Sequence, residues 1–342
     1  MSSVDSESIL IWGAGAIGGT IGAYWARAGQ PVAFVDVVPE HVAAIAARGI
    51  AIEGPIETFT APPAPAFTPD KVTGTYRRIV LAVKAQHTAD AARQLAPHLH
   101  PEGYVLSAQN GLNELAIAEV VGTARTMGCF VNFGSDYLEP GRILFGGRGA
   151  VVVGELDGRT TPRVEAMHAL LRLFEPNAEL TDNIWGYLWG KLGYGALLFA
   201  TALTNESIAD ALASSRHFDL YRRLAGEAMQ VARTRGVKPL GFNGYEPLAF
   251  MPGAAEAQTR ASIDAMVAHN RRSAKSHSGI WRDIAVRKRK TEIDAQIAII
   301  GRIGRDAGIA TPLIDRLVAL IHDVEDGKRP QSWATLDALA AT

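Results

Sequence analysis

Cysteine is almost missing from this sequence of 342 residues. Cys129 is the one cysteine, so neither an internal disulfide nor a cysteine cluster for a metal ion is available, and we expect no metal site. Long apolar runs are missing too, because the longest, Leu192–Leu203, is too short to span a bilayer. Residues 1–8 lack the basic and apolar segments of a secretory signal. These absences favour a cytoplasmic protein with no membrane partner.

The sequence also has no excess of basic or acidic residues. The formal net charge is −1, with 20% charged and 48% hydrophobic residues, as in an ordinary soluble globular protein. Such a balance argues against a nucleic-acid partner, which favours a basic field, and against disorder, which favours an acidic excess. The length allows two domains with substantial cores.

A glycine-rich turn near the N-terminus carries the strongest functional signal. The apolar run Ile9–Trp12 leads directly into a G-x-G-x-x-G pattern. Its first glycine allows a tight turn, its second lets the backbone approach a pyrophosphate, and its third lets the next helix lie close to the strand. The helix N-terminus then faces the phosphates. The residues predicted to bind a dinucleotide here are Gly13, Ala14, Gly15, Ala16, Ile17 and Gly18.

The residues after this pattern support the same interpretation, since the pattern alone is weak in a chain with 34 glycines. The amphipathic stretch Thr20–Gly29 follows, and a β-rich run from residue 31 ends in Asp36, about 20 residues beyond the glycines. Together these segments form a complete βαβ unit. The alternative is an ordinary α/β turn that happens to be rich in glycine.

Asp36 also predicts which dinucleotide is bound. A carboxylate at this place accepts hydrogen bonds from both ribose hydroxyls of NAD, whereas it repels the 2′-phosphate of NADP. Like charges about 4 Å apart repel by about 1 kcal/mol in water and by about 4 kcal/mol at an effective dielectric constant of about 20. The next residues, Val37, Val38 and Pro39, offer no cation, so we expect NAD in preference to NADP. The alternative is a solvated turn aspartate, with Arg48 or another remote base binding the phosphate.

The strand and helix signals over the first half are typical of a doubly wound α/β sheet. Strands expected over 78–83 and 104–107 end beside Lys84 and beside Asn110 and Gly111. Ligands bind beyond the carboxyl ends of strands in such sheets, so these three residues are candidates for cofactor contacts. Plain turn chemistry is the alternative unless both segments meet the glycine loop at one edge.

Further along, the strand signals shorten. The segments 126–132, 142–145 and 149–154 predict an antiparallel extension of the parallel sheet. The segment 61–70 carries four prolines and is expected to be a surface loop. A helix near 163–173 would help to close this domain.

Long helical periods replace the strand signals beyond Asp182. We therefore predict a Rossmann-type NAD-binding domain over 1–182 and an all-α substrate and dimerisation domain over 183–342. The helices expected in the second domain span residues 183–205, 207–213, 217–235, 255–283, 287–307 and 312–325.

Lys191 is the informative charge in the first of these helices. Tyr187, Lys191, Gly195 and Phe199 share one helix face at a spacing of four residues. A lysine surrounded by so much apolar surface tends to have a lowered pKa, which suits proton transfer. The alternative is a lysine whose ammonium group reaches the surface from an amphipathic helix.

A short basic run over 287–290 precedes another candidate. The run is too short and isolated to indicate nucleic acid, and a solvated helix start or an anion site explains it better. Lys290 or Thr291 would begin the next helix, with Glu292 and Asp294 in its first turn. Acidic residues are favoured there by the helix dipole, which is the structural alternative to a functional role for Glu292.

Taken together, these features resemble the ketopantoate reductase (2-dehydropantoate 2-reductase) family. The matching segments occur in the order found in that family and extend over nearly the whole chain. They are Gly13–Gly18, Val83–Ala85, Gln109–Gly111, Pro140–Arg142, Val153–Glu155, Trp189–Leu192 and Thr291–Asp294. The resemblance implies a Rossmann domain joined to an all-helical domain.

The resemblance also implies roles for single residues. In that family the lysine matching Lys191 is the general acid for the keto group, and the glutamate matching Glu292 lies beside the reacting centre and the cofactor. The residues matching Lys84 and Asn110 line the cofactor and substrate cleft. This implies an NAD(P)-dependent oxidoreductase that transfers hydride between nicotinamide and a small hydroxy or keto compound, with a homodimer as the family-level expectation.

Three positions depart from the family pattern. Gly195 and Phe199 replace asparagines that the family uses on its substrate, and Ser278 matches the carboxylate-binding serine only with shifted spacing. We expect a substrate bulkier or less polar than ketopantoate, contacted by Asn110 and these three residues, with His277 and Arg282 as further candidates for an anionic end. Genuine 2-dehydropantoate reduction in pantothenate synthesis and a non-catalytic nicotinamide-sensing protein are the two alternatives.

Overall fold

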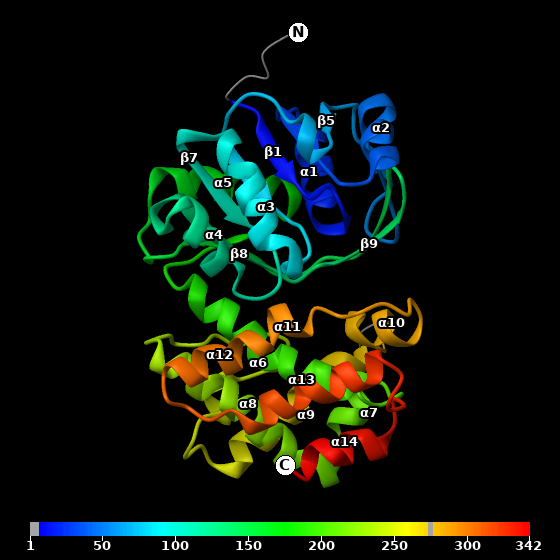
Figure 1. Cartoon of the computed structure of the whole chain (residues 1–342), viewed down its shortest axis with the longest axis vertical. Helices are drawn as coiled ribbons and strands as arrows, with labels where there is room; N and C mark the ends of the chain where they lie inside the picture. Colours follow the sequence, from blue (N-terminus) through cyan, green and yellow to red (C-terminus); the bar gives the residue numbers. More distant parts are fainter. Residues whose placement is uncertain (1–6, 273–275) are drawn as a thin grey trace. The chain divides into compact units, whose positions relative to one another are not determined.

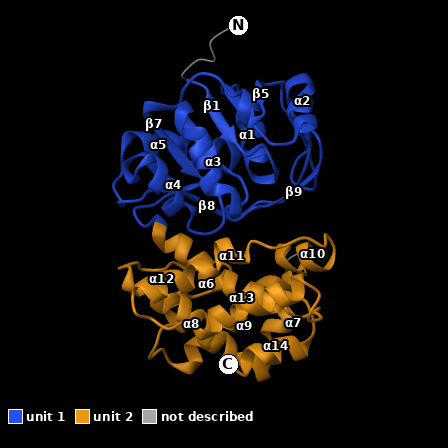
Figure 2. Ribbon diagram, in the orientation of Figure 1, with its two compact units in different colours: residues 1–184 blue, residues 185–342 orange. Residues whose placement is uncertain are grey.

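The structure is a computed structural model that describes residues 7–272 and 276–342. It divides into two compact units, residues 1–184 and 185–342 (Figure 2). The division falls two residues beyond the boundary expected after residue 182.

A sheet of eight strands forms the centre of the first unit (Figure 1). The strand order is β12-β11-β8-β7-β6-β1-β2-β5, and every neighbouring pair is parallel except β8 with β11. This arrangement confirms the predicted Rossmann-type fold. The strands are β1 (Ile9–Trp12), β2 (Val32–Val35), β5 (Ala66–Phe67), β6 (Tyr76–Leu81), β7 (Leu99–Ser107), β8 (Thr126–Val131), β11 (Val151–Glu155) and β12 (Glu179–Leu180).

Helices cover both faces of this sheet, which explains why β1 is a continuous apolar run. Ile9 and Ile11 belong to one buried cluster, together with residues of α1 (Ala16–Arg27) and α5 (Pro162–Phe174). Leu10 and Trp12 belong to the opposite cluster, which includes residues of α3 (Thr88–Leu95) and α4 (Asn113–Val121). The core therefore fixes β1, and with it the glycine turn that follows.

A second, smaller sheet corrects part of the sequence prediction. It has the order β4-β3-β10-β9, where β3 is Ala51–Glu53, β4 is Phe59–Thr60, β9 is Gly134–Glu139 and β10 is Arg142–Gly147. Only β11 extends the main sheet in the antiparallel sense, whereas β10 pairs in parallel with β3. The half-exposed β9 lacks apolar alternation and was therefore not predicted.

The proline-rich segment 61–70 was also predicted incompletely. It contains the two-residue strand β5, which pairs with β2 at the edge of the main sheet. Proline is tolerated beside such an edge, and a strand this short has no periodicity to detect. The helix α2 (Pro39–Arg48) lies between β2 and β3 in the chain.

The second unit is helical, as predicted. The expected helix over 255–283 is broken, because Ser278 caps a new helix, and the one over 287–307 begins only after the basic run, where Lys288 has a positive φ of 52°. The C-terminal helix α14 was not predicted. The helices are α6 (Ile184–Thr201), α7 (Ile208–Leu212), α8 (Phe218–Thr234), α9 (Glu256–Arg272), α10 (Gly279–Ala285), α11 (Ile293–Gln296), α12 (Ala298–Asp306), α13 (Pro312–Glu325) and α14 (Trp333–Ala340).

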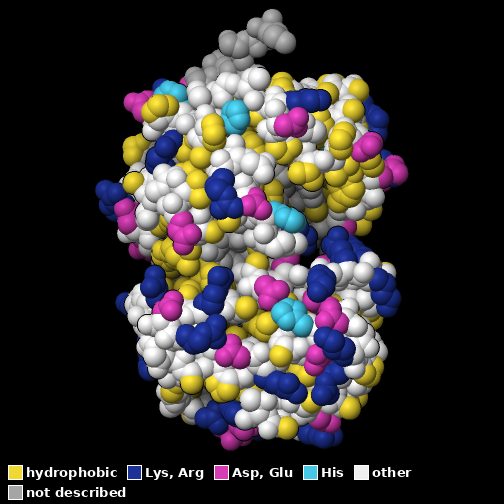
Figure 3. All heavy atoms as spheres, in the orientation of Figure 1, with side chains coloured by type: hydrophobic (Ala, Val, Ile, Leu, Met, Phe, Trp, Pro, Cys, Tyr) yellow, Lys and Arg dark blue, Asp and Glu magenta, His cyan; other side chains and the backbone are white. Residues whose placement is uncertain are grey.

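Surface charge is mixed on the visible face of both units, where basic and acidic side chains lie beside one another (Figure 3). This distribution agrees with the formal net charge of −1. Across residues 7–272 and 276–342, no helix combines the length and apolar character needed to cross a membrane.

Candidate active site

The glycine turn after β1 has the geometry that its sequence predicts. Gly13 has a φ of 102°, and a Cβ atom there would lie 2.8 Å from the backbone of Ala82 and Val83. The backbone N–H groups of Gly13 and Ala14 both donate to the carbonyl of Val35, at 2.8 and 3.1 Å. Gly13 therefore lets the chain turn tightly against the ends of β6 and β2.

The other two glycines differ in their surroundings: Gly15 borders open space, and Gly18 is closely packed. Gly15 precedes α1, and a Cβ atom there would meet nothing within 4 Å among the described residues. At Gly18, by contrast, a Cβ atom would overlap the carbonyl oxygen of Gly13. No described side chain caps α1, so its first N–H groups suit an anion in the open space beside Gly15.

Asp36 is held in place at the end of β2. Its Oδ1 atom accepts the N–H of Val38 at 3.0 Å, and its own N–H donates to the Phe67 carbonyl at 3.1 Å. Arg48, the alternative phosphate ligand, lies at the other end of α2 and donates to the Pro140 carbonyl at 2.9 Å. The acidic group is therefore the fixed charge that directly follows β2.

The Lys84 and Asn110 segments meet at one edge of the sheet. Their strands, β6 and β7, are parallel neighbours in which Leu81 pairs with Ser107. Both Lys84 and Asn110 are exposed. Since Gly13 packs against the backbone of Val83, the glycine loop lies at this same edge, which was the condition for preferring ligand binding over plain turn chemistry.

A chain of buried side chains that the sequence prediction missed joins these segments. Gln109 Nε2 donates to the Val83 carbonyl at 2.8 Å and to Thr88 Oγ1 at 2.7 Å. Thr88 donates to Asn113 Oδ1 at 2.8 Å, and Asn113 Nδ2 donates to the Asn110 carbonyl at 2.7 Å. The Gln109-Asn110-Gly111 motif was the available signal, but only the fold pairs it with Thr88.

Glu114 lies in the first turn of α4, which directly follows the same loop in the chain. It is 0% exposed, and burial raises the pKa of its carboxyl to about 8, an effect that its backbone and the Ser107 hydroxyl only partly offset. The side chain is therefore mostly protonated at neutral pH.

In the helical unit, the predicted face of α6 divides into an accessible and a buried part. Lys191 and Gly195 are partly exposed, and a Cβ atom at Gly195 would meet only Ile297 Cδ1, at 3.9 Å, among the described atoms. Phe199 is 1% exposed and packs in the core. Lys191 and Gly195 thus share an accessible strip, while a substrate contact by Phe199 stays a prediction.

Glu292 is the N-cap residue of α11 rather than a member of its first turn. Asp294 does lie in that turn, where its carboxylate pairs with His322 Nε2 at 3.1 Å. Thr291 donates its N–H and its hydroxyl to Glu325, at 2.7 and 2.6 Å. Because Ile297, which directly follows α11, is the neighbour of Gly195, this short helix lies close to the accessible strip of α6 (Figure 1).

Ser278 has a structural role in α10. Its Oγ atom accepts the N–H of Trp281 at 3.1 Å as a helix cap. His277 packs against Trp281 with ring centroids 4.1 Å apart, and its Nε2 lies 3.2 Å from the carbonyl of Asn205. A substrate role for Ser278, His277 or the partly exposed Arg282 stays a prediction.

The basic run is occupied by ion pairs within its own unit. Arg287 and Arg289 both pair with Asp283 at 2.8 Å, and Lys290 lies 3.5 Å from Asp326. Arg287, Arg289 and Lys290 thus each have an acidic partner within the helical unit.

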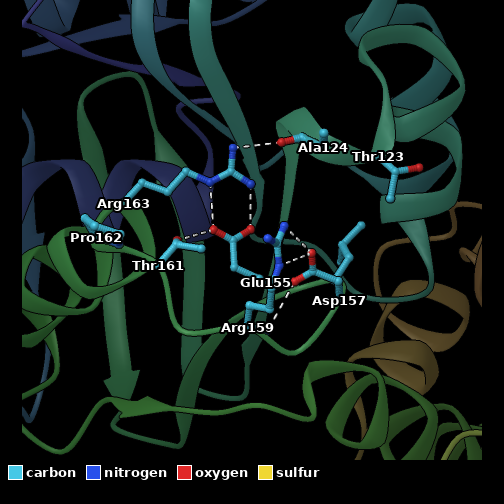
Figure 4. Close-up of a pocket in the computed structure, with 9 residues that line it drawn as sticks. Thr123, Ala124, Glu155, Asp157, Arg159, Thr161, Pro162 and Arg163 are labelled. Carbon is cyan, nitrogen blue, oxygen red and sulfur yellow. Dashed lines mark hydrogen bonds and ion pairs between the residues drawn. The ribbon is translucent and has the colours of Figure 1, made fainter.

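Glu155, the end of the Val153-Gly-Glu155 motif, lines a surface pocket of about 660 Å³ in the first unit (Figure 4). Its carboxylate receives two hydrogen bonds from Arg163, at 2.7 and 2.6 Å, and one from the Thr161 hydroxyl at 2.6 Å. Arg159 pairs with Asp157 in the same pocket at 2.7 Å. These paired charges join β11 to the start of α5, so Glu155 stabilises the fold.

A Rossmann-type unit with this glycine loop, followed by a helical unit, is typical of oxidoreductases that use a nicotinamide dinucleotide. Two family models match the chain: ketopantoate reductase PanE/ApbA over residues 9–158 and ketopantoate reductase PanE/ApbA C terminal over residues 183–325. The chain belongs to the ketopantoate reductase family. It is an NAD(P)-dependent oxidoreductase of ketopantoate-reductase-like type, which confirms the predicted family and enzyme class.

Similar proteins cover almost the full length. A 2-dehydropantoate 2-reductase from Mesorhizobium japonicum is 27% identical over 340 residues, which cover 92% of this chain and 96% of the relative. One from Pyrococcus horikoshii is 28% identical over 323 residues, with coverage of 93% and 97%.

Solved structures show the same fold. A PanE/ApbA family ketopantoate reductase from Ralstonia eutropha aligns with a TM-score of 0.77 and 26% identity, over 94% of this chain and 99% of that one. A D-mandelate dehydrogenase solved with NADH and anilino(oxo)acetate aligns with a TM-score of 0.78 and 21% identity over the same shares.

Proposed function

We propose that this protein prefers NAD(H) to NADP(H) and transfers hydride between nicotinamide and a small hydroxy or keto compound other than ketopantoate. The single observation that carries the cofactor preference is the Asp36 carboxylate, fixed at the end of β2 by the Val38 N–H. A fixed carboxylate favours ribose hydroxyls and repels a 2′-phosphate. The open space beside Gly15 supports a close approach by the pyrophosphate of either dinucleotide.

In the proposed reaction, a side chain of the protein transfers the proton to or from the substrate oxygen. When bound, the reduced cofactor supplies the hydride for the carbonyl carbon. Lys191 Nζ delivers a proton to the carbonyl oxygen, or accepts one from the hydroxyl when an alcohol is oxidised. Glu292 orients or balances the charge of that lysine, and Asn110 holds cofactor and substrate.

The substrate proposal depends on the accessible strip of α6. Gly195 leaves open space where the family has an asparagine, so a bulkier or less polar group fits there than in a ketopantoate site. Ser278, whose Oγ accepts the Trp281 N–H as a helix cap, would donate its hydroxyl hydrogen to an anionic end of the substrate. NAD use makes oxidation of a hydroxyl group as plausible a physiological direction as reduction.

Genuine 2-dehydropantoate reduction is the second candidate function, favoured by the names and full-length coverage of the curated relatives. A non-catalytic nicotinamide sensor is the third, motivated by the loss of both asparagines. Screening hydroxy acids and polyol-like alcohols with NAD, and keto acids including ketopantoate with NADH and NADPH, separates the three. Turnover of ketopantoate above all other compounds would overturn our substrate proposal, and binding without any turnover would favour the sensor.

A homodimer and a cytoplasmic location complete the proposal. A dimeric ketopantoate reductase from Staphylococcus aureus shares the fold, with a TM-score of 0.68 at 18% identity. Light scattering on the purified protein measures the oligomeric state.

A further inference from the structure

We propose that His41 is a positioning residue that sets the orientation of the glycine loop for the dinucleotide. This inference rests on the proposed dinucleotide site at residues 13–18. His41 lies in α2 and is 0% exposed. It belongs to none of the motifs that predict the site from the sequence.

The imidazole joins two segments that are distant in the sequence. Nε2 lies 2.8 Å from the carbonyl oxygen of Ala14, inside the glycine loop. Nδ1 accepts the backbone N–H of Gly141, in the turn between β9 and β10, at 2.9 Å. Because Nδ1 is the acceptor and a carbonyl only accepts, Nε2 carries the hydrogen and donates it to Ala14. Both ring nitrogens are thus used by backbone groups.

The bond to Ala14 determines the direction of a neighbouring donor. The Ala14 carbonyl and the Gly15 N–H belong to one planar trans peptide, in which the two bonds point in opposite directions. The Ala14 N–H is itself fixed by the Val35 carbonyl at 3.1 Å. Holding the Ala14 oxygen toward His41 therefore turns the Gly15 N–H away from it, at the helix start expected to meet the pyrophosphate.

The Gly141 turn is firmly anchored and gives the imidazole a fixed support. Gly141 has a φ of 80°, and a Cβ atom there would lie 3.0 Å from the Cβ of Ala44 in α2. Arg48, about two turns beyond His41 in α2, donates to the Pro140 carbonyl. The ring of Tyr137 packs edge-on against His41, with centroids 5.1 Å apart. These contacts leave the imidazole one orientation, which it transmits to the loop.

Three substitutions of His41 distinguish its hydrogen bond to Ala14 in the glycine loop from its hydrogen bond to Gly141 in the β9–β10 turn. His41→Gln places an amide N–H near the Nε2 position and retains the donor to Ala14, whereas His41→Asn places a carbonyl near Nδ1 and retains the acceptor for Gly141. His41→Ala removes both. His168→Ala is the matched control, since His168 Nε2 also bonds a backbone carbonyl, that of Ala178 at 2.8 Å, in the same unit.

The measurements are the Kd of NADH by fluorescence titration, KM and kcat on the best substrate of the screen, and Tm. We expect His41→Ala and His41→Asn to raise the Kd and KM for NADH about tenfold, the usual effect of losing one hydrogen bond, with kcat within about twofold of the wild type. His41→Gln should recover most of this affinity. His168→Ala should lower Tm without changing the Kd.

An unchanged Kd in His41→Ala, or equal affinities of His41→Gln and His41→Asn, would overturn the positioning role while leaving the proposed dinucleotide site intact. A wild-type protein that binds neither NADH nor NADPH would overturn that site, and this inference with it. If His41→Ala does not fold, the comparison of the Gln and Asn variants still decides the question.

Discussion

Gly18 packs against Gly13 so closely that a Cβ atom at Gly18 would overlap the Gly13 carbonyl oxygen, whereas one at Gly15 would enter open space. Two glycines of one motif therefore serve different purposes. The third determines how α1 packs on β1, and the second leaves room for a ligand.

Alanine substitutions at these two glycines should accordingly have opposite effects. Gly15 has an ordinary φ of −68°, and a Cβ atom there would clash with no described atom, so Gly15→Ala should keep Tm within a few degrees of the wild type. The added methyl group would occupy the space left for the ligand, so the Kd for NADH should rise at least tenfold. Gly18→Ala should lower the free energy of unfolding by about 1–3 kcal/mol through overpacking. Thermal unfolding and fluorescence titration measure both quantities. A Gly15→Ala variant with wild-type affinity would show that no phosphate lies beside residue 15.

The charge at Asp36 should control cofactor preference. We expect wild-type protein to bind NADH at least tenfold more tightly than NADPH, because a carboxylate repels the 2′-phosphate. Asp36→Ser should narrow that ratio, mainly by strengthening NADPH binding. Titrating both cofactors against both proteins tests this, and equal or tighter NADPH binding by the wild type would refute the Asp36 argument.

Removing the amine of Lys191 should affect turnover far more than cofactor binding. Lys191→Ala should reduce kcat on the best substrate by about 10²–10⁴-fold, the usual contribution of a general acid or base, with the Kd for NADH little changed. Lys328→Ala, which alters an exposed lysine paired with Asp326, serves as the control. A loss of less than about tenfold in Lys191→Ala would mean that another group transfers the proton.

Glu114 should make stability depend on pH. Burial raises the pKa of its carboxyl from an ordinary value of 4.5 to about 8, so between these values the folded state keeps a proton that the unfolded state has released. The resulting stabilisation is full below about pH 4.5 and is lost as the pH rises through about 8.

Denaturant unfolding from pH 5 to 9 measures that dependence. Glu114→Gln, which keeps the shape and has no such proton to lose, should show a flatter profile and gain stability relative to the wild type above pH 8. Parallel profiles for the two proteins would exclude Glu114 as the titrating group.

The sequence predicted the features that depend on local pattern. The apolar run of β1, the three glycines and the helical face of α6 are visible because their spacing follows strand or helix periodicity. It did not reveal β9 or the pairing of β10 with β3, since half-exposed short strands carry little periodic signal. His41 and Thr88 were missed for a different reason: each acquires its role from a partner that only the fold brings close.

Phe199 shows that helical spacing does not predict burial. Helical spacing correctly places it on the face of Lys191 and Gly195, but burial varies along that face, and residue 199 lies in the core. Periodicity predicts a direction around the helix axis and carries no information on how far along the axis the neighbouring helices extend.

The bond from Gly141 to His41 joins residues 100 positions apart, and β10 pairs with β3 across a similar separation. These long-range contacts imply an order in which parts of the first unit fold. A nascent chain that has completed only β1, α1 and β2 already contains the whole dinucleotide motif, but the turn that holds its loop has yet to be made. Long-range pairing of this kind forms late, because loop closure precedes its stabilising contacts. We therefore expect the full affinity for a dinucleotide to appear only once β10 has joined the small sheet.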